Sequence, residues 1–174
     1  MHAEFIAYAG DCRVKGRIDV APDARLSDWM NLLDAITVRD AELTSHADGH
    51  VVSLDEITID RYDLYAVEAL SARGDTTRRV HTVRHRLQVK LGPYMVLGYL
   101  HAFPGSGPLV SLPRRAPMIP LTTATIAFDG GTAIEAHDIE TLIVNRELVD
   151  WVRPEEVAPA LLGFKKPAPE PAAG

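Results

Sequence analysis

Two stretches in the second half of the chain decide the fold: Pro117-Met118-Ile119-Pro120-Leu121-Thr122-Thr123-Ala124-Thr125-Ile126 and Glu140-Thr141-Leu142-Ile143-Val144-Asn145-Arg146-Glu147-Leu148-Val149-Asp150-Trp151-Val152. Residues 122–128 and 141–144 have the composition of β-strands, and Asp129-Gly130-Gly131 between them is a turn signal. Asn145-Arg146-Glu147 predicts a tight turn, in which asparagine tolerates a left-handed conformation. Residues 148–152 then predict a closing strand that ends before Pro154.

An earlier stretch of the chain repeats this pattern in a weaker form. Five pairs match at an offset of 82 residues: Gly10 with Gly92, Val14 with Val96, Gly16 with Gly98, Ile18 with Leu100 and Pro22 with Pro104. Five more pairs match at an offset of 83: Leu26 with Leu109, Ile36 with Ile119, Val38 with Leu121, Ala41 with Ala124 and Leu43 with Ile126. Three pairs match at an offset of 84: Glu56 with Glu140, Ile59 with Ile143 and Leu64 with Leu148. The offset changes only in stretches rich in Gly, Asp or Pro, where loops tolerate insertions. We therefore expect a duplicated fold, with chance matching of apolar residues as the alternative.

The repeat divides the 174-residue chain into a first β unit (1–70), a basic connector (71–80), a second β unit (81–158) and a Pro/Ala-rich tail (159–174) that we expect to be unstructured. Each unit has several short strand patterns separated by turn signals, so the expected fold is mainly β: two tandem small antiparallel barrels or rolls. Residues 26–34 predict one short helix, capped by Ser27. The second unit has Pro113 and Pro117 in the corresponding place, which disfavours a normal helix. Gly16 within a strand pattern suggests a bulge or a close backbone approach.

The composition limits the expected cellular compartment and the classes of binding partner. The net charge of −6 is uneven, since residues 1–70 hold 6 basic and 14 acidic side chains and residues 71–174 hold 12 and 10. An acidic first unit disfavours broad nucleic-acid binding, which requires neutralisation of phosphates. The single cysteine, Cys12, excludes an intrachain disulfide and a cysteine-based zinc site. With neither a signal peptide nor an uninterrupted apolar span, we expect a cytoplasmic protein.

The chain resembles an uncharacterised bacterial family of small β domains with the pattern RLSDxLN, then FIPLTDA, then VNRExI. The first unit carries Arg25-Leu26-Ser27-Asp28-Trp29-Met30-Asn31, and the second carries Ile119-Pro120-Leu121-Thr122-Thr123-Ala124 and Val144-Asn145-Arg146-Glu147-Leu148. Each unit has lost part of the pattern, so the chain looks like two diverged copies. The resemblance implies no assigned activity.

Each unit also resembles an Sm-like barrel. The matching residues are Gly16-Arg17-Ile18, Asp28-Trp29-Met30-Asn31 and Ile59-Asp60-Arg61-Tyr62-Asp63-Leu64. The resemblance implies ring assembly, and RNA contacts at Asn31 and Arg61. The late glycine of the Sm pattern is missing from both units, and the second unit lacks the Asp-x-Met-Asn element.

Other candidate sites each have a structural interpretation. A basic stretch comprises Arg73, Arg78, Arg79, Arg84, Arg86 and Lys90. It is either a contact for nucleic acid or an acidic partner, or a solvated linker that balances the acidic first unit, and we prefer the linker. Asn145 and Arg146 suit a turn or an interaction, while Trp29 and Trp151 suit core packing or, if exposed, a partner anchor.

No pattern in the sequence supports catalysis or a cofactor. His81 and His85 lie in a strand pattern that separates them too widely for one metal ion, and the Gly105-Ser106-Gly107 loop lacks the helix that a phosphate site needs. We therefore expect a non-enzymatic module for protein interaction or assembly, in contact with a protein partner or with itself. The alternatives are an Sm-like nucleic-acid-binding protein and a small-ligand sensor whose pocket lies between the copies.

Overall fold

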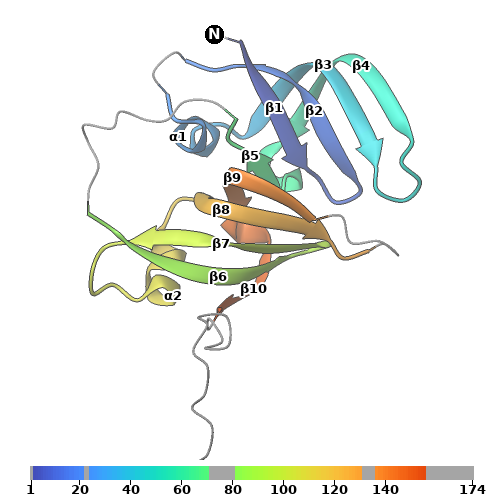
Figure 1. The fold of residues 1–174 in the computed structure, drawn as a ribbon. Helices are drawn as coiled ribbons and strands as arrows, with labels where there is room; N and C mark the ends of the chain where they lie inside the picture. The colour runs from blue at the N-terminus through green and yellow to red at the C-terminus, as the bar shows by residue number, and fades with distance from the viewer. Residues whose placement is uncertain (1, 22–23, 71–80, 131–135, 156–174) are drawn as a thin grey trace, which may run out of the picture.

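The computed structural model describes residues 2–21, 24–70, 81–130 and 136–155. Their strands form one ten-stranded antiparallel sheet in the order β10-β6-β7-β8-β9-β5-β1-β2-β3-β4 (Figure 1). The strands of the first half are β1 (His2–Tyr8), β2 (Cys12–Asp19), β3 (Ala35–Ser45), β4 (Val51–Asp60) and β5 (Ala66–Glu68). Those of the second half are β6 (Val83–Leu91), β7 (Tyr94–Ala102), β8 (Met118–Phe128), β9 (Ala136–Asn145) and β10 (Val149–Pro154). The prediction of a mainly β fold is confirmed.

The two halves share one sheet instead of forming two closed barrels. β5 pairs with β1 on one side and with β9 on the other, so it joins the halves into a continuous surface. Figure 1 shows the two curved halves meeting where β5 and β9 lie side by side. The sheet ends at β4 and β10, which each have one strand neighbour within the described residues. The predicted connector (71–80) and tail (159–174) lie outside these residues.

Both halves follow the same order, β5-β1-β2-β3-β4 and β10-β6-β7-β8-β9. Ile36 lies opposite Ile59 and Ile119 lies opposite Val144, so the position of Ile59 corresponds to Val144, 144 − 59 = 85 residues later. The offset of 84 that the sequence pattern predicted for this strand, which matched Ile59 to Ile143, is wrong by one residue. Apolar residues are abundant on both faces of β9, so pattern matching alone did not reveal the shift. Residues at the same sheet position are called counterparts below.

Glycine allows the same bulge in each half. The register of β2 with β3 shifts around Gly16, and that of β7 with β8 shifts around Gly98. On the facing strands β3 and β8, the bulge residues Asp40 and Thr123 both have a φ of 48°. A Cβ atom on Gly16 would lie 2.5 Å from Val38 Cγ1 and 2.7 Å from the Arg39 carbonyl oxygen, so only glycine fits. The predicted bulge or close approach at Gly16 is therefore confirmed.

The short helices differ from the predictions at their ends. α1 (Leu26–Asn31) is shorter than predicted, and its N-cap is Arg25 without a side-chain hydrogen bond, not Ser27. The second half forms one helical turn, α2 (Pro108–Ser111), followed by the 3₁₀ turn η3 (Leu112–Arg114). Prolines permit these turns because each lies in a first turn, where its missing N–H has no helical partner anyway. Two further 3₁₀ turns, η1 (Arg61–Asp63) and η4 (Arg146–Leu148), precede the closing strands.

Two apolar cores lie on the two sides of the junction, and each includes residues from both halves. The first core contains Phe5, Met30, Ile36 and Leu64 of the first half, and the β8 residue Met118 and β9 residue Ile143 also pack into it. The second core is built mainly from β6 to β9 and takes in Ile6, Tyr8 and Ala66 of the first half. Neither half therefore completes its core alone, which agrees with the small size of each.

Candidate interaction site

The junction between the halves is a short antiparallel pairing of β5 with β9. Ala66, Val67 and Glu68 lie opposite Val144, Ile143 and Leu142. The amide of Asn145 donates to the Tyr65 carbonyl at 2.8 Å, and the amide of Ala69 donates to the Thr141 carbonyl at 2.9 Å. Because backbone hydrogen bonds alternate in direction along a strand, Thr141, Ile143 and Asn145 direct their backbone groups toward β5. Counted in chain order within each half, the fourth strand of the second half (β9) thus pairs with the fifth strand of the first half (β5).

Asn145, a residue predicted to serve a turn or an interaction, closes one end of this junction. Its side chain is fully buried, and Nδ2 donates to the carbonyls of Arg61 (3.2 Å) and Leu64 (3.1 Å) in the first half. Oδ1 accepts the amide of Glu147 at 3.1 Å, which forms the turn of η4. The predicted turn is present, and with a φ of −84° Asn145 does not use the left-handed conformation that asparagine tolerates, because its side chain makes the turn.

Asn31, at the end of α1, closes the junction beside β8. Its Nδ2 donates to the carbonyls of Ser27 (2.8 Å) and Met118 (3.1 Å), and its Oδ1 accepts the Met118 amide at 2.9 Å. Both the N–H donor group and the oxygen acceptor of the side-chain amide are therefore hydrogen-bonded within the protein. Met118 is paired with Asn145 across β8 and β9, so the contacts of the two asparagines adjoin: Asn31 bonds Met118 of the second half, and Asn145 bonds carbonyls of the first half.

Arg61, the other residue suggested for RNA contact, is almost completely buried. Its guanidinium lies 4.8 Å from the centre of the Tyr62 ring, and Nη1 lies 4.0 Å from Glu147 Oε2 in the second half. Among the described residues, Nε and Nη1 have no hydrogen-bond partner. The structure therefore does not bring Arg61 and Asn31 together on an exposed surface, because both face the junction.

Aromatic residues connect the halves at the other side of the sheet. His46, in the loop between β3 and β4, stacks on Phe128 with ring centres 4.3 Å apart, and its Nε2 lies 2.6 Å from Tyr94 Oη. The Tyr94 hydroxyl also donates to the Ala9 carbonyl. Burial lowers the pKa of His46, the Asp11 carboxylate opposes that shift and Arg13 adds to it. Because the Tyr94 hydroxyl has a single hydrogen, His46 Nε2 is the donor in this contact.

Tyr8 forms a second buried polar contact near the junction. Its hydroxyl donates to Glu68 Oε1 at 2.7 Å, and Arg13 Nη2 lies 3.4 Å from the same oxygen. Burial, together with the Glu68 carboxylate, raises the pKa of Tyr8. The contact holds β5 against β1, and so it supports the strand that pairs with β9.

The outer strands β4 and β10 occupy the same sheet positions as the junction strands β9 and β5, but the outer edge of each faces no strand of this chain within the described residues. β4 exposes Val51, Val52 and Leu54 together with the acidic residues Asp55, Glu56 and Asp60. The amide of Arg61 donates to the Asp34 carbonyl beside β3. By alternation along the strand, the backbone groups of Glu56, Thr58 and Asp60 point outward. Such a row of unpaired groups is a template for another strand.

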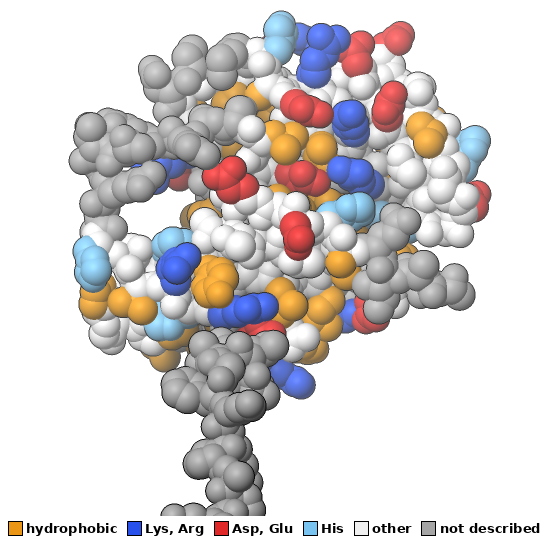
Figure 2. All heavy atoms as spheres, in the orientation of Figure 1, with side chains coloured by type: hydrophobic (Ala, Val, Ile, Leu, Met, Phe, Trp, Pro, Cys, Tyr) orange, Lys and Arg blue, Asp and Glu red, His pale blue; other side chains and the backbone are white. Residues whose placement is uncertain are grey.

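The other predicted residues are spread over the surface. Trp29 is partly buried and packs against the first core, whereas Trp151 lies on β10 beneath Arg153, whose Cζ is 4.4 Å from the ring centre. Arg84 and Arg86 both lie over the Tyr99 ring, and Arg86 pairs with Glu155. Arg73, Arg78 and Arg79 lie outside the described residues. On the face shown in Figure 2, basic and acidic side chains are interspersed over the first half. One ion pair of the first half joins Arg39 to Asp19 at 2.8 Å.

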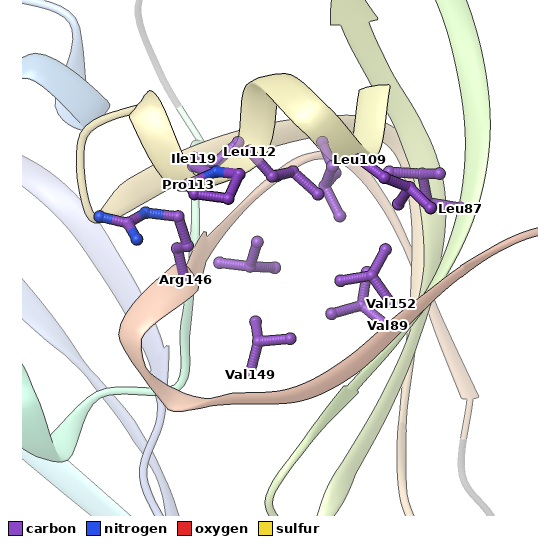
Figure 3. A pocket seen from close by; sticks show the side chains of 11 residues that line it. Leu87, Val89, Leu109, Leu112, Pro113, Ile119, Arg146, Val149 and Val152 are labelled. Carbon is purple, nitrogen blue, oxygen red and sulfur yellow. The ribbon is translucent and has the colours of Figure 1, made fainter. Parts of the chain in front are cut away.

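A cavity of about 380 Å³ opens beneath α2 in the second half (Figure 3). Its walls come from β6, β8, β9, β10 and the α2–η3 segment. The lining residues are Leu87, Val89, Leu109, Leu112, Pro113, Ile119, Leu121, Val144, Arg146, Val149 and Val152. In Figure 3 the Val89, Val149 and Val152 side chains point into the space, while the Arg146 guanidinium turns away from its centre. The cavity belongs to the second half and not to the boundary between the halves, where the sequence placed a sensor pocket.

The counterparts of the cavity residues form the closed core of the first half. They are Phe5, Ala7, Leu26, Trp29, Met30, Ile36, Val38, Ile59, Arg61, Leu64 and Val67. Met30 is fully buried where Pro113 is exposed, and Phe5 stands in place of Leu87. At these two positions a smaller or more exposed side chain in the second half thus helps to leave the cavity. Sequence reasoning missed it because it treated both sets as equivalent apolar positions; the change from Met30 to Pro113 was the available signal.

Comparison with protein-family models, curated proteins and solved structures finds no match to this chain. Within the described residues, no three His, Cys, Asp or Glu side chains are grouped so as to hold a metal ion. No helix in the same part of the chain is long and apolar enough to cross a membrane. The resemblances to the small β family and to Sm-like barrels remain predictions.

Proposed function

We propose that this chain is a non-enzymatic assembly module of the cytoplasm, whose copies associate head to tail by pairing β4 of one copy with β10 of the next. The observation that carries the proposal is the β5–β9 junction, in which strands at the same two positions already pair within one chain. We also infer that the halves are diverged copies of one unit, which the shared bulge supports. A head-to-tail contact of this kind produces a ring if the rotation closes and a filament if it does not.

The junction register predicts the contact between copies. Replacing each junction residue by its counterpart places Trp151, Val152 and Arg153 opposite Ile59, Thr58 and Ile57 of the next copy. Val152 would then exchange backbone hydrogen bonds with Thr58. Pro154, the counterpart of Ala69, has no N–H to donate, so the outer pairing is one bond weaker than the junction.

Charged residues at the two edges are complementary. Asn31 and Asn145, which close the junction, have Arg114 and Asp60 as their counterparts at the outer edges. In the proposed contact, Arg114 of one copy lies beside Ala35 and Asp60 of the next, because Ala35 and Asp60 are paired. Arg114 and Asp60 are both exposed in the single chain. The contact thus replaces two amides with an ion pair, and joins the acidic first half of one copy to Arg114 of another.

Light scattering during size-exclusion chromatography tests this proposal. Wild type is expected to elute as a multimer without excess absorbance at 260 nm. Thr58→Pro removes one outward N–H while leaving the bonds to β3, so it is expected to give a folded monomer. Thr58→Val keeps the N–H and loses only the Thr37 contact at 3.1 Å, so it should retain the multimer. A monomeric wild type, or a Thr58→Pro multimer equal to wild type, would overturn the proposal.

A further inference from the structure

The second-half cavity has an apolar interior and one cationic side chain at its margin. Ten of its eleven lining residues are apolar, and the eleventh is Arg146. Its volume of about 380 Å³ is at the small end of the range for ligand pockets, which is about 300–1,000 Å³. The first-half counterpart positions are filled by their own side chains, so an open space is not a requirement of the fold.

Arg146 lacks the carboxylate that its counterpart has. In the first half, Arg61 faces Glu147 Oε2 at 4.0 Å across the junction. No carboxylate of the described residues pairs with Arg146, and its Nε is buried without a hydrogen-bond partner in that part of the chain. A buried N–H of a charged group costs free energy unless an acceptor is supplied.

Assembly of the chain supplies neither the missing volume nor the missing charge. Met118 and Ile143 pack into the first core from the other half. Their counterparts in a neighbouring copy are Ala35 and Thr58, which are smaller. The counterpart of Glu147 is Tyr62, which has no carboxylate. The vacancy beneath α2 is therefore present in the single chain and in an assembly.

We propose that the cavity is a binding site for a medium-chain aliphatic monocarboxylate. The hydrocarbon chain would lie among Val89, Val149 and Val152, and the carboxylate would sit at the margin beside Arg146. A rotation of the Arg146 side chain toward the mouth would let a charge-assisted hydrogen bond form. α2, which exposes Leu109 and Val110 and buries no residue of its own, would cover the chain. This site goes beyond the proposed assembly and does not depend on it.

Isothermal titration calorimetry with decanoate below its micelle concentration tests the site, with decan-1-ol as the uncharged probe. Wild type is expected to bind both, and decanoate more tightly. Arg146→Gln should weaken decanoate binding by about tenfold or more, because a hydrogen bond to a charged group is lost, while leaving decanol binding unchanged. Arg86→Gln, which removes a cation on β6 that does not line the cavity, is the matched control and should alter neither affinity.

A second pair of variants fills the cavity without touching the charge. Leu87→Phe and Pro113→Met introduce the residues of the first half at their counterpart positions, and are expected to abolish binding of both probes. Circular dichroism and thermal melting confirm that these variants fold. Absence of decanoate binding in wild type, binding that survives the filled cavity, or equal affinity of wild type and Arg146→Gln would overturn the site. The Thr58→Pro monomer should still bind, so failure of assembly and failure of binding are distinguishable.

Discussion

The space beneath α1 in the first half is filled, whereas the corresponding space beneath α2 in the second half is open. The difference begins with side chains: Met30 and Trp29 reach into the first core, while Pro113 and Leu112 occupy the same positions in the second half. The halves also differ at their strand edges: β5 is paired with β9, whereas its counterpart β10 lies at the end of the sheet. The comparison teaches that one strand order can produce a closed structural half and a half whose core and edge remain accessible.

The largest expected effect contrasts the two helices. Met30→Ala should lower the free energy of unfolding by about 2–5 kcal/mol, because it leaves a cavity in a closed core. Pro113→Ala, at the exposed counterpart, should change it by no more than about 0.5 kcal/mol. Urea denaturation of both variants measures the difference. Equal costs would mean that the two halves are packed alike, against our description.

Asn145 at the junction and its counterpart Asp60 at the outer edge can each be replaced by the residue of the other. Asn145→Asp replaces a buried N–H donor by a carboxylate facing the carbonyls of Arg61 and Leu64, and should cost about 3 kcal/mol in denaturant unfolding. The reverse change at the counterpart, Asp60→Asn, should be nearly neutral because Asn retains the side-chain oxygen that accepts the Tyr62 amide. If Asn145→Asp is also neutral, the amide does not hold the halves together.

The third prediction uses the ion pair that replaces these asparagines between copies. Asp60→Lys or Arg114→Glu alone should weaken association about fivefold, corresponding to about 1 kcal/mol for an ion pair at a partly exposed contact. The double variant should restore the wild-type association constant, as measured by sedimentation equilibrium. Glu42→Lys, a charge reversal on the inner strand β3, controls for net charge. If the two losses of affinity add in the double variant, Asp60 and Arg114 do not form an ion pair between copies.

The smallest expected effect is the pH dependence of the His46 contact between the halves. Its pKa is lowered in the folded protein by burial, so the unfolded chain binds the proton more readily. This contribution to stability is complete above the ordinary pKa of 6.5 and decreases as the pH falls from there toward the lowered value. His46→Phe, which keeps stacking on Phe128, should reduce the dependence of the melting temperature on pH between 7 and 5. An unchanged dependence would assign it to other groups, such as His101, whose pKa burial also lowers.

The strands were predictable because their signals are local. Alternating apolar residues and the Gly-Asp, Asp-Gly and Gly-Pro turns place the strands, and Gly16 indicates the bulge. The joining of the halves was not predictable in this way. β5 is only three residues long, and nothing in Ala66-Val67-Glu68 says that it pairs on both sides. Pairing between distant strands depends on three-dimensional geometry that a sequence pattern does not contain.

The site was predicted less well than the fold. Asn145 and Arg146 were chosen as a turn or an interaction, and the structure places Asn145 at the junction and Arg146 at the margin of the cavity. Asn31 and Arg61 were chosen for RNA contact, and the structure places both at the junction instead. Polar residues that close an internal contact and those that bind a partner have the same composition, so burial is needed to tell them apart.

Amide hydrogen exchange of one counterpart pair tests the proposed edge pairing most directly. Ile143 and Thr58 occupy the same position, on the junction strand β9 and the outer strand β4. The Ile143 amide is expected to be protected at every protein concentration, whereas the Thr58 amide is expected to become protected as the concentration rises, and to require a higher concentration in Arg114→Glu. A Thr58 amide that exchanges rapidly at all concentrations, while Ile143 stays protected, would contradict the pairing of β4 with β10.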